Sequence, residues 1–334
     1  MINKKSLFIL VVLFTLLIVT ACGGKASDTN AAKKGSDADS SNQYPNRQIE
    51  IIVPFAAGGG TDAVARVLAE SLKPILNQEI VVVNREGGSG ANGMNEGLNA
   101  NPDGYTLTLV TREVAALPLQ GIAPFETMDF KFVANVNEDP GVLVVPANSS
   151  YNNVQDLVEE VKANPGKMKF AASVVPNYYG IQFSEGTEVE FTTVPYQGAA
   201  PAITEILGGG ADFGIYTPGE IKQFIDSGDL RPLAVMATER YQGLDDVPTF
   251  QEEGFNIVSG TYRGIAVPKD TPGEVVQVLS EAIKEAVETE KFKEFMNESF
   301  LGIGYYDSKE FEELIKNDIG ILKPIIEIAK KEEN

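Results

Sequence analysis

The most regular pattern in the chain is an almost unbroken apolar run, Ile49–Phe55, followed by three glycines and a segment of helical period. Such a run is typical of a strand buried on both faces, and Gly58–Gly60 free the backbone to turn tightly. Thr61 or Asp62 can then cap a helix that continues to Leu76. The apolar residues of that helix recur at steps of three and four, which predicts one face packed on a sheet: Val64, Val67, Leu68, Leu72 and Ile75.

The start of this helix is a candidate anion site. The backbone N–H groups of a first helical turn have no partner within the helix, and the helix dipole adds partial positive charge there. A phosphate loop is disfavoured because no Lys follows the glycines, and the Gly-x-Gly-x-x-Gly spacing of dinucleotide sites is also missing. The alternative is that the glycines only make a tight turn.

Strand-like and helix-like segments alternate along the rest of the chain, which predicts parallel sheets with helices on their faces. Two further loops open a helix after a strand in the same way, at Gly87–Gly90 and at Gln197–Pro201. The length that follows the N-terminal segment suits two cores better than one. We therefore expect an α/β protein with two lobes, each a mainly parallel sheet flanked by helices.

The N-terminal segment has a basic start, an apolar run over residues 7–19 and small residues before Cys22, which is the composition of a secretion signal. The run is too short to span a bilayer. We interpret residues 1–21 as a lipoprotein signal peptide and Cys22 as the lipidated residue, because Val19–Cys22 resembles the bacterial lipobox. An unrelated cysteine beside an ordinary cleavage site is the alternative. Residues 22–43 are polar and predict a disordered tether.

The composition narrows the function. Of 334 residues, 27 are Lys or Arg and 47 are Asp or Glu, and the formal net charge is −20. This charge argues against nucleic acid and anionic membrane surfaces as partners. The absence of His excludes triads and metal sites that depend on imidazole. No paired-carboxylate or Ser-x-x-Lys pattern stands out, so an extracellular enzyme is disfavoured and no cofactor or metal is predicted.

A set of short motifs runs through the chain in order: Tyr44–Arg47, Val53–Asp62, Asn84–Gly90, Asn101–Thr106, Val194–Gly198, Leu207–Gly209, Leu233–Val235, Val247–Thr249 and Tyr262–Gly264. Together they strongly resemble the substrate-binding proteins of tripartite tricarboxylate transporters, also called the Bordetella uptake gene family. Each motif alone is weak, but their order is specific and covers nearly all of the chain beyond the tether.

The resemblance implies a Venus-flytrap fold of the second periplasmic-binding-protein type, with lobe 1 at residues 44–145 and 264–334 and lobe 2 at residues 146–263. It implies a solute-binding protein that captures a small organic acid, such as a di- or tricarboxylate, between the lobes and delivers it to a membrane permease driven by an ion gradient. We expect an extracytoplasmic monomer, anchored by lipid on Cys22, at a Gram-positive surface rather than in a periplasm. A receptor for an ATP-driven importer, or a ligand-sensing accessory protein of the same fold, is the alternative.

The resemblance also implies a ligand site in which main-chain N–H groups of the glycine loops hold a carboxylate. Arg263 could grip a further carboxylate, or else form a salt bridge at the hinge. Asp62 is better explained as a helix cap and a partner of Arg66 than as a ligand group, unless the ligand is an amine. Tyr196 could donate its hydroxyl or form a wall. The predicted ligand residues are Phe55, Ala57, Gly58, Gly59, Gly60, Thr61, Asp62, Ser89, Gly90, Thr111, Ser173, Tyr196, Gln197, Gly198, Ala199 and Arg263.

The chain departs from the family pattern at Ser173–Tyr179, where members carry a small Gly/Ser-rich loop and then a longer helix. Here only Gly180–Glu190 precede the next strand, and Tyr178 or Tyr179 could fill space that a ligand would otherwise take. Arg112, at the end of a strand, could also reach the cleft. The identity of the acid is therefore not carried over from relatives.

Overall fold

The structure is a computed structural model, and it describes residues 44–173, 176–196 and 198–332. The signal peptide, the lipidation site at Cys22 and the tether lie outside the described residues and stay predictions. Among the described helices, none is long and apolar enough to cross a membrane.

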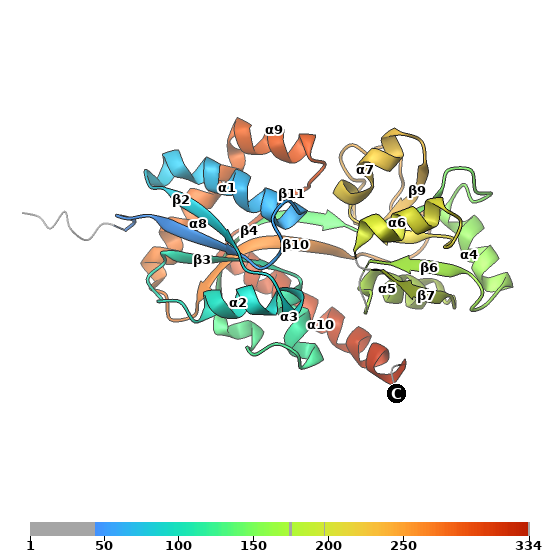
Figure 1. Cartoon of the computed structure of the whole chain (residues 1–334), viewed down its shortest axis with the longest axis horizontal. Coiled ribbons are helices and arrows are strands. Elements are labelled where there is room, and N and C mark those ends of the chain that lie inside the picture. The colour runs from blue at the N-terminus through green and yellow to red at the C-terminus, as the bar shows by residue number, and fades with distance from the viewer. Residues whose placement is uncertain (1–43, 174–175, 197, 333–334) are drawn as a thin grey trace, which may run out of the picture. The chain divides into compact units, whose positions relative to one another are not determined.

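A six-stranded sheet with the order β11-β4-β10-β3-β1-β2 forms the centre of the first lobe (Figure 1). Its strands are β1 (Ile49–Val53), β2 (Ile80–Asn84), β3 (Thr106–Thr111), β4 (Phe130–Pro140), β10 (Gly260–Pro268) and β11 (Ile303–Tyr306). The predicted apolar run around β1 is buried in this core, where Ile49, Ile51 and Val53 are each 0% exposed.

Helices cover both faces of this sheet. One face packs against α1 (Gly60–Leu76), α8 (Gly273–Glu288) and α9 (Glu290–Glu298). The other face packs against α2 (Ala91–Leu98), α3 (Glu113–Gln120) and α10 (Ser308–Glu332). Two short 3₁₀ turns, η1 (Gly88–Gly90) and η2 (Thr127–Asp129), complete the lobe. The predicted apolar stripe of α1 faces the sheet, since Val64, Leu68 and Leu72 are fully buried there.

The second lobe is built on a three-stranded sheet with the order β8-β5-β9 and on a parallel pair of strands, β6 and β7. A β-bridge between Phe170 of β6 and Phe213, the residue before β8, connects the pair to the sheet. Its core is a group of packed aromatic rings around Phe183. Its elements are β5 (Val142–Pro146), α4 (Val154–Ala163), β6 (Lys169–Ala172), α5 (Tyr178–Thr187), β7 (Thr192–Pro195), α6 (Ala199–Leu207), β8 (Gly214–Tyr216), α7 (Pro218–Asp226) and β9 (Leu230–Val235).

The chain passes between the two lobes at the ends of β4 and β10. The last residue of β4, Pro140, pairs with Gly260, the first residue of β10. Beyond this pair, the Gly141 N–H donates to the Ser259 carbonyl at 2.9 Å, so that the two passages are bonded to each other. These points lie a few residues before the crossings predicted from the sequence.

The predicted α/β fold is confirmed, but its sheets are mixed rather than mainly parallel. β1 runs parallel to β2 and β3, and β6 runs parallel to β7. In contrast, β10 is antiparallel to both β3 and β4, and β5 is antiparallel to both β8 and β9. β10 is antiparallel to β4 because β4 leaves the first lobe and β10 returns to it, so the two strands lie side by side in opposite directions.

The sequence analysis did not predict α3, α5, β11 or the two 3₁₀ turns. Residues 273–298 form two successive helices, α8 and α9. The break falls at Thr289, whose extended backbone ends α8 and whose hydroxyl accepts from the Phe292 N–H to cap α9.

Candidate functional site

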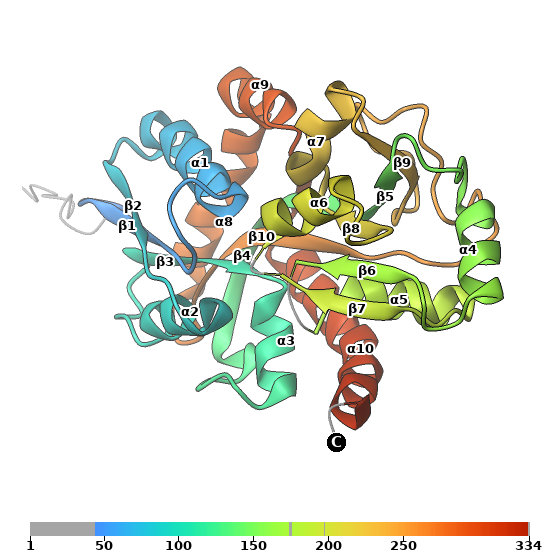
Figure 2. The same ribbon diagram turned by 45° about the vertical axis from the view of Figure 1, so that its right-hand side comes forward.

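The loop between β1 and α1 leaves the start of α1 open. Residues 56–60 are exposed, and Gly59 is the N-cap of α1. No side-chain hydrogen bond caps this helix start. Thr61 and Asp62 were predicted as caps, and this was wrong, because Gly59 already has the extended backbone of an N-cap and both residues lie inside the first turn. In Figures 1 and 2 this end of α1 faces the segment that carries α6.

The Asp62 side chain stabilises the loop between β1 and α1 through hydrogen bonds. Its carboxylate accepts from the Gly58 N–H at 2.8 Å, from Arg66 Nε at 2.9 Å and from Asn84 Nδ2 at 3.0 Å. Burial opposes its ionisation, but the hydrogen bonds from Arg66, Gly58 and Asn84 outweigh burial and hold the pKa of Asp62 below its ordinary value. The expected pairing of Asp62 with Arg66 is therefore present. The charge of Asp62 is balanced before any ligand arrives.

The second glycine loop lies against the first. A Cβ placed on Gly90 would stand 3.0 Å from Cζ of Phe55, so the ring of Phe55 covers Gly90 at van der Waals distance. Asn84 joins the loops further, because its Nδ2 donates to the Phe55 carbonyl at 2.9 Å. Ser89 and Gly90 both have positive φ, 55° and 98°, and α2 starts at Gly90 without a side-chain cap.

The third predicted loop belongs to the second lobe. The Tyr196 N–H donates to the Ala172 carbonyl at 2.9 Å, and the Gly198 N–H donates to the Ser173 carbonyl at 3.0 Å. The structure thus brings Ser173 together with Gly198 and Ala199, where α6 begins without a side-chain cap. Half-buried Tyr196 packs on the core of the second lobe, which favours the wall interpretation. The predicted ligand residue Gln197 lies outside the described residues.

The glycine starts differ from other helix starts in this protein. Asn153 caps α4, Asn177 caps α5 and Thr289 caps α9, each through a side-chain oxygen that accepts from a first-turn N–H. In contrast, α1, α2 and α6 begin at glycines with no such acceptor. α3 and α8 also lack a side-chain cap, but they begin at Arg112 and Pro272. The first-turn amides of α1 and α6 can therefore bind an acceptor from outside, whereas the Ala91 and Asn92 N–H groups of α2 already donate to the Gly88 and Gly87 carbonyls.

Arg263 lies within β10, directly opposite Thr111 of β3, and only 9% of it is exposed. Its Nε donates to Thr61 Oγ1 at 3.1 Å, and its Nη1 donates to Asn137 and Asp139. A Cβ on Gly60 would lie 3.4 Å from its Nη2, so the guanidinium stands beside the first turn of α1. The salt bridge at the hinge, given as the alternative role of Arg263, is present with Asp139. It holds the guanidinium beside the loop between β1 and α1. The predicted ligand residue Ala57 lies in the exposed part of that loop.

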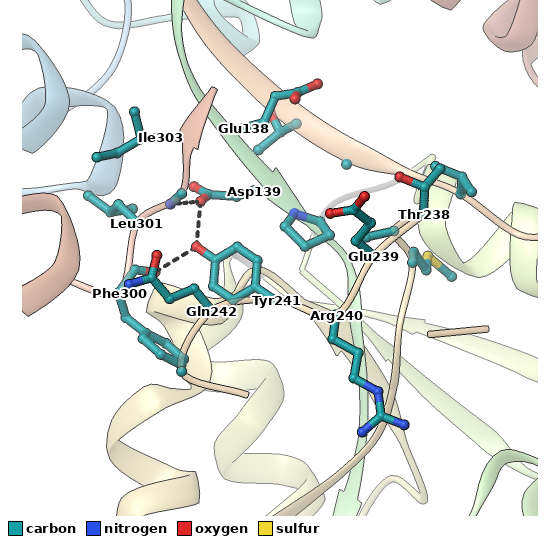
Figure 3. Close-up of a pocket in the computed structure, with 18 of the residues that line it drawn as sticks. Glu138, Asp139, Thr238, Glu239, Arg240, Tyr241, Gln242, Phe300, Leu301 and Ile303 are labelled. Atoms are coloured by element: carbon teal, nitrogen blue, oxygen red, sulfur yellow. Dashed lines mark hydrogen bonds between the residues drawn. The ribbon is translucent and has the colours of Figure 1, made fainter. Parts of the chain in front are cut away.

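Asp139 connects this site to a larger pocket at the hinge, of about 590 Å³ (Figure 3). The Asp139 carboxylate accepts from the Gly302 N–H at 2.8 Å and from the Tyr241 hydroxyl at 3.3 Å. Beside it, burial raises the pKa of Glu138 despite a 2.9 Å hydrogen bond from the Tyr306 hydroxyl. The sequence analysis missed this network.

One signal for it exists in the sequence, because polar residues alternate along an otherwise apolar strand at Asn135, Asn137 and Asp139, all of which are 0% exposed. Buried polar groups need partners, so such an alternation marks a strand that meets polar groups of another segment.

A smaller cavity, of about 120 Å³, lies between the lobes. It brings together Ser89 of the first lobe and Ser173 of the second, both predicted ligand residues, with Arg112, Tyr178 and Tyr179. Arg112 reaches this cavity as expected, but its charge is already paired.

Comparison with known proteins agrees with this arrangement. A model of the family described as "Tripartite tricarboxylate transporter family receptor", TctC, matches residues 64–330. The chain belongs to this family. The TctC family consists of extracytoplasmic solute-binding receptors with a two-domain α/β fold, and it is not a family of enzymes.

Individual relatives support the assignment. Protein BugT of Bordetella pertussis is 32% identical over 75% of this chain and 79% of its own length. A TctC solute-binding protein from Polaromonas, solved without ligand, is 32% identical over 85% of this chain and 99% of its own, with a TM-score of 0.77. The R. palustris protein Rpa4515, solved with adipate, is 25% identical over 86% of this chain and 99% of its own, with a TM-score of 0.75.

Proposed function

We propose that this chain is a lipid-anchored receptor that binds a small di- or tricarboxylate between its lobes and delivers it to an ion-gradient-driven tripartite tricarboxylate permease. The lobes comprise residues 44–140 with 260–334, and residues 141–259, so that each division lies a few residues earlier than in the sequence analysis. The receptor acts as a monomer. The ligand residues are those predicted from the sequence, with the main-chain amides of the glycine loops as the principal donors.

The observation that carries this proposal is the uncapped start of α1 beside a guanidinium. The seventeen-residue helix α1 directs its first-turn amides into an exposed glycine loop, and Arg263 is hydrogen-bonded to Thr61 within that turn. The helix dipole and the first-turn amides favour a negative group there. Because Asp139 balances the charge of Arg263, the site attracts an anion by oriented donors more than by net charge.

The energetics are sufficient without a dedicated cation. A hydrogen bond to a charged group contributes roughly 1.5–3 kcal/mol. Two loops that each supply two amides to one carboxylate therefore support a Kd near 1 μM, which corresponds to about −8 kcal/mol. The adipate bound in the R. palustris relative is an acid of the proposed class.

Isothermal titration calorimetry of the mature chain tests the proposal, with citrate, malate, succinate, adipate, aromatic acids and acidic amino acids as ligands. We expect saturable binding of at least one di- or tricarboxylate at low millimolar concentration or below. Absence of heat and of thermal stabilisation with every organic acid would contradict it.

The anchor needs a separate test, since Cys22 lies outside the described residues. In cells fed a radiolabelled or alkyne-tagged fatty acid, the wild-type chain should carry the label and Cys22→Ala should not. A Gram-positive membrane surface is the proposed location. Labelling that is equal in both chains would remove the anchor from the proposal and leave the ligand site in place.

A further inference from the structure

Tyr178, the first residue of α5, bridges the two lobes. Gln120 at the end of α3 donates from Nε2 to the Tyr178 hydroxyl, and the guanidinium carbon of Arg112 lies 5.8 Å from the centre of the Tyr178 ring. The backbone that carries Tyr178 is held in place, because the buried Asn177 caps α5 by accepting from the Gly180 N–H at 2.9 Å. The ring is therefore a fixed part of the interlobe surface.

The same ring limits the cavity that holds two predicted ligand residues. Ser89 and Ser173 face the cavity of about 120 Å³ together with Tyr178 and Tyr179. Sites for drug-sized ligands usually measure about 300–1,000 Å³, so this space fits only a small acid. The aromatic rings and the serines share this small space, so the rings limit the room for an acid bound at the serines.

The charges behind Tyr178 do not favour a second carboxylate. Arg112 lies beside the ring, but its Nη2 lies 2.7 Å from Oδ1 of Asp318 and its Nη1 donates to Ser259 at 3.0 Å. Only 6% of Arg112 and 7% of Asp318 are exposed. A buried and fully paired guanidinium gives little attraction to a further anion.

The Tyr178 hydroxyl also stays neutral, because burial outweighs the hydrogen bond from Gln120 and raises the pKa of Tyr178 to about 12. The lining around Tyr178 therefore combines an aromatic ring and a neutral hydroxyl with the paired Arg112 and with Glu113, a carboxylate that repels a further acid group. Such a wall offers no partner to the second carboxylate of an acid long enough to reach it.

We propose that Tyr178 sets the maximum length of the ligand, so that the receptor selects short dicarboxylates such as malonate and succinate over long ones such as adipate and suberate. The inference rests on the proposed function, which it deepens by naming the residue that selects the acid. It concerns a segment in which this chain departs from the family pattern.

The test is the ratio of Kd values for adipate and succinate, measured by calorimetry on wild type and on Tyr178→Ala. We expect succinate to bind wild type at least about tenfold more tightly than adipate, since even one unaccommodated methylene can cost this much. Removing the ring should reduce the ratio at least tenfold. Tyr178 could also act by holding the lobes together, but loss of that role would weaken both acids equally and leave the ratio unchanged.

Two further variants keep the test decisive. Tyr178→Leu fills more of the space than Ala and serves if Tyr178→Ala does not fold, and it should lower the ratio in the same direction. Tyr178→Phe removes the hydroxyl and its hydrogen bond with Gln120 but keeps the ring, so it should preserve the wild-type ratio. An unchanged ratio in folded Tyr178→Ala or Tyr178→Leu would overturn the inference, as would a wild type that binds adipate more tightly than succinate. Failure of wild type to bind any acid would instead contradict the proposed function itself.

Discussion

Arg263 and Asp139 form a buried ion pair across β10 and β4, the two strands that link the lobes, with 9% of Arg263 and 0% of Asp139 exposed. The two residues of this pair also make hydrogen bonds to two different parts of the molecule. On one side Arg263 reaches Thr61 in the first turn of α1, and on the other Asp139 accepts from Tyr241 in the hinge pocket. The position of the guanidinium beside the candidate ligand loop therefore depends on a carboxylate that the loop itself does not contain.

Asp139→Asn should strongly destabilise the protein. The substitution keeps the shape of the side chain but leaves the Arg263 charge buried without its counter-ion, and breaking such a pair costs about 3–5 kcal/mol. Urea denaturation gives the change in the free energy of unfolding. Glu288→Gln is the matched control, because its pair with Lys293 is solvent-exposed and should contribute at most about 1 kcal/mol. Equal small losses for both variants would show that the hinge pair is not needed for stability.

Asp62→Asn should reveal a pH-dependent part of the stability. The folded-state pKa of Asp62 is lower than its ordinary value of 3.8, so the charged form stabilises the fold above that value and the contribution is lost as pH falls through the folded-state pKa. Near pH 7 we expect the variant to be less stable by about 1–2 kcal/mol, toward the low end for hydrogen bonds to a charged group. The difference from wild type, followed by denaturation at pH 7, 5 and 3, should shrink at the lowest pH. A constant difference would contradict this account.

Two glycine-to-alanine substitutions should have opposite effects. A Cβ on Gly93 in α2 would lie 2.6 Å from the Arg85 carbonyl oxygen and 2.7 Å from the Pro54 Cα, which are backbone atoms that cannot turn aside. We expect Gly93→Ala to lower the free energy of unfolding by about 1–3 kcal/mol. Gly320 in α10 has no atom within 4 Å of its Cβ position, so Gly320→Ala should raise it by roughly 0.5–1 kcal/mol. Thermal unfolding of both variants checks the prediction, and destabilisation of similar size in both would refute it.

The sequence predicted the parts of the fold that depend on local pattern. The apolar run at Ile49–Phe55, the stripe of α1 and the glycine loops each carry their signal within a few residues, and the structure places them as expected. α3 was missed because Pro118 interrupts its short helical period. β11 has only four residues, and it is a strand because it pairs with β4, which lies far away in the sequence. Neither α3 nor β11 therefore has a local sequence pattern from which it could be predicted.

The sequence predicted the parts of the candidate site that main-chain groups of the glycine loops form. It did not predict the contacts between side chains that lie far apart in the sequence. Arg263 was singled out, but its partners Asn137 and Asp139 lie 126 and 124 positions away in the chain, and only the pairing of β10 with β4 brings them together. The contact between Gln120 and Tyr178 likewise joins two helices that the pattern did not predict. The error at Thr61 and Asp62 has a different cause, because a glycine N-cap has no side-chain signature.

The central claim is that the first-turn amides of α1 hold the carboxylate of the ligand, and calorimetry on Gly59→Asp tests it most directly. Gly59 has the backbone conformation of an N-cap, and a Cβ there would meet only the Ala56 carbonyl oxygen, at the ordinary distance of 3.7 Å. The new carboxylate should cap the helix itself and change the stability by only a few tenths of a kcal/mol.

Gly59→Ala is the control, since it adds the Cβ without an acceptor. We predict that Gly59→Asp binds the acid at least about tenfold more weakly than wild type, through the loss of one or more charge-assisted hydrogen bonds of roughly 1.5–3 kcal/mol each, while Gly59→Ala stays within about threefold. Wild-type affinity in a folded Gly59→Asp variant would contradict the account.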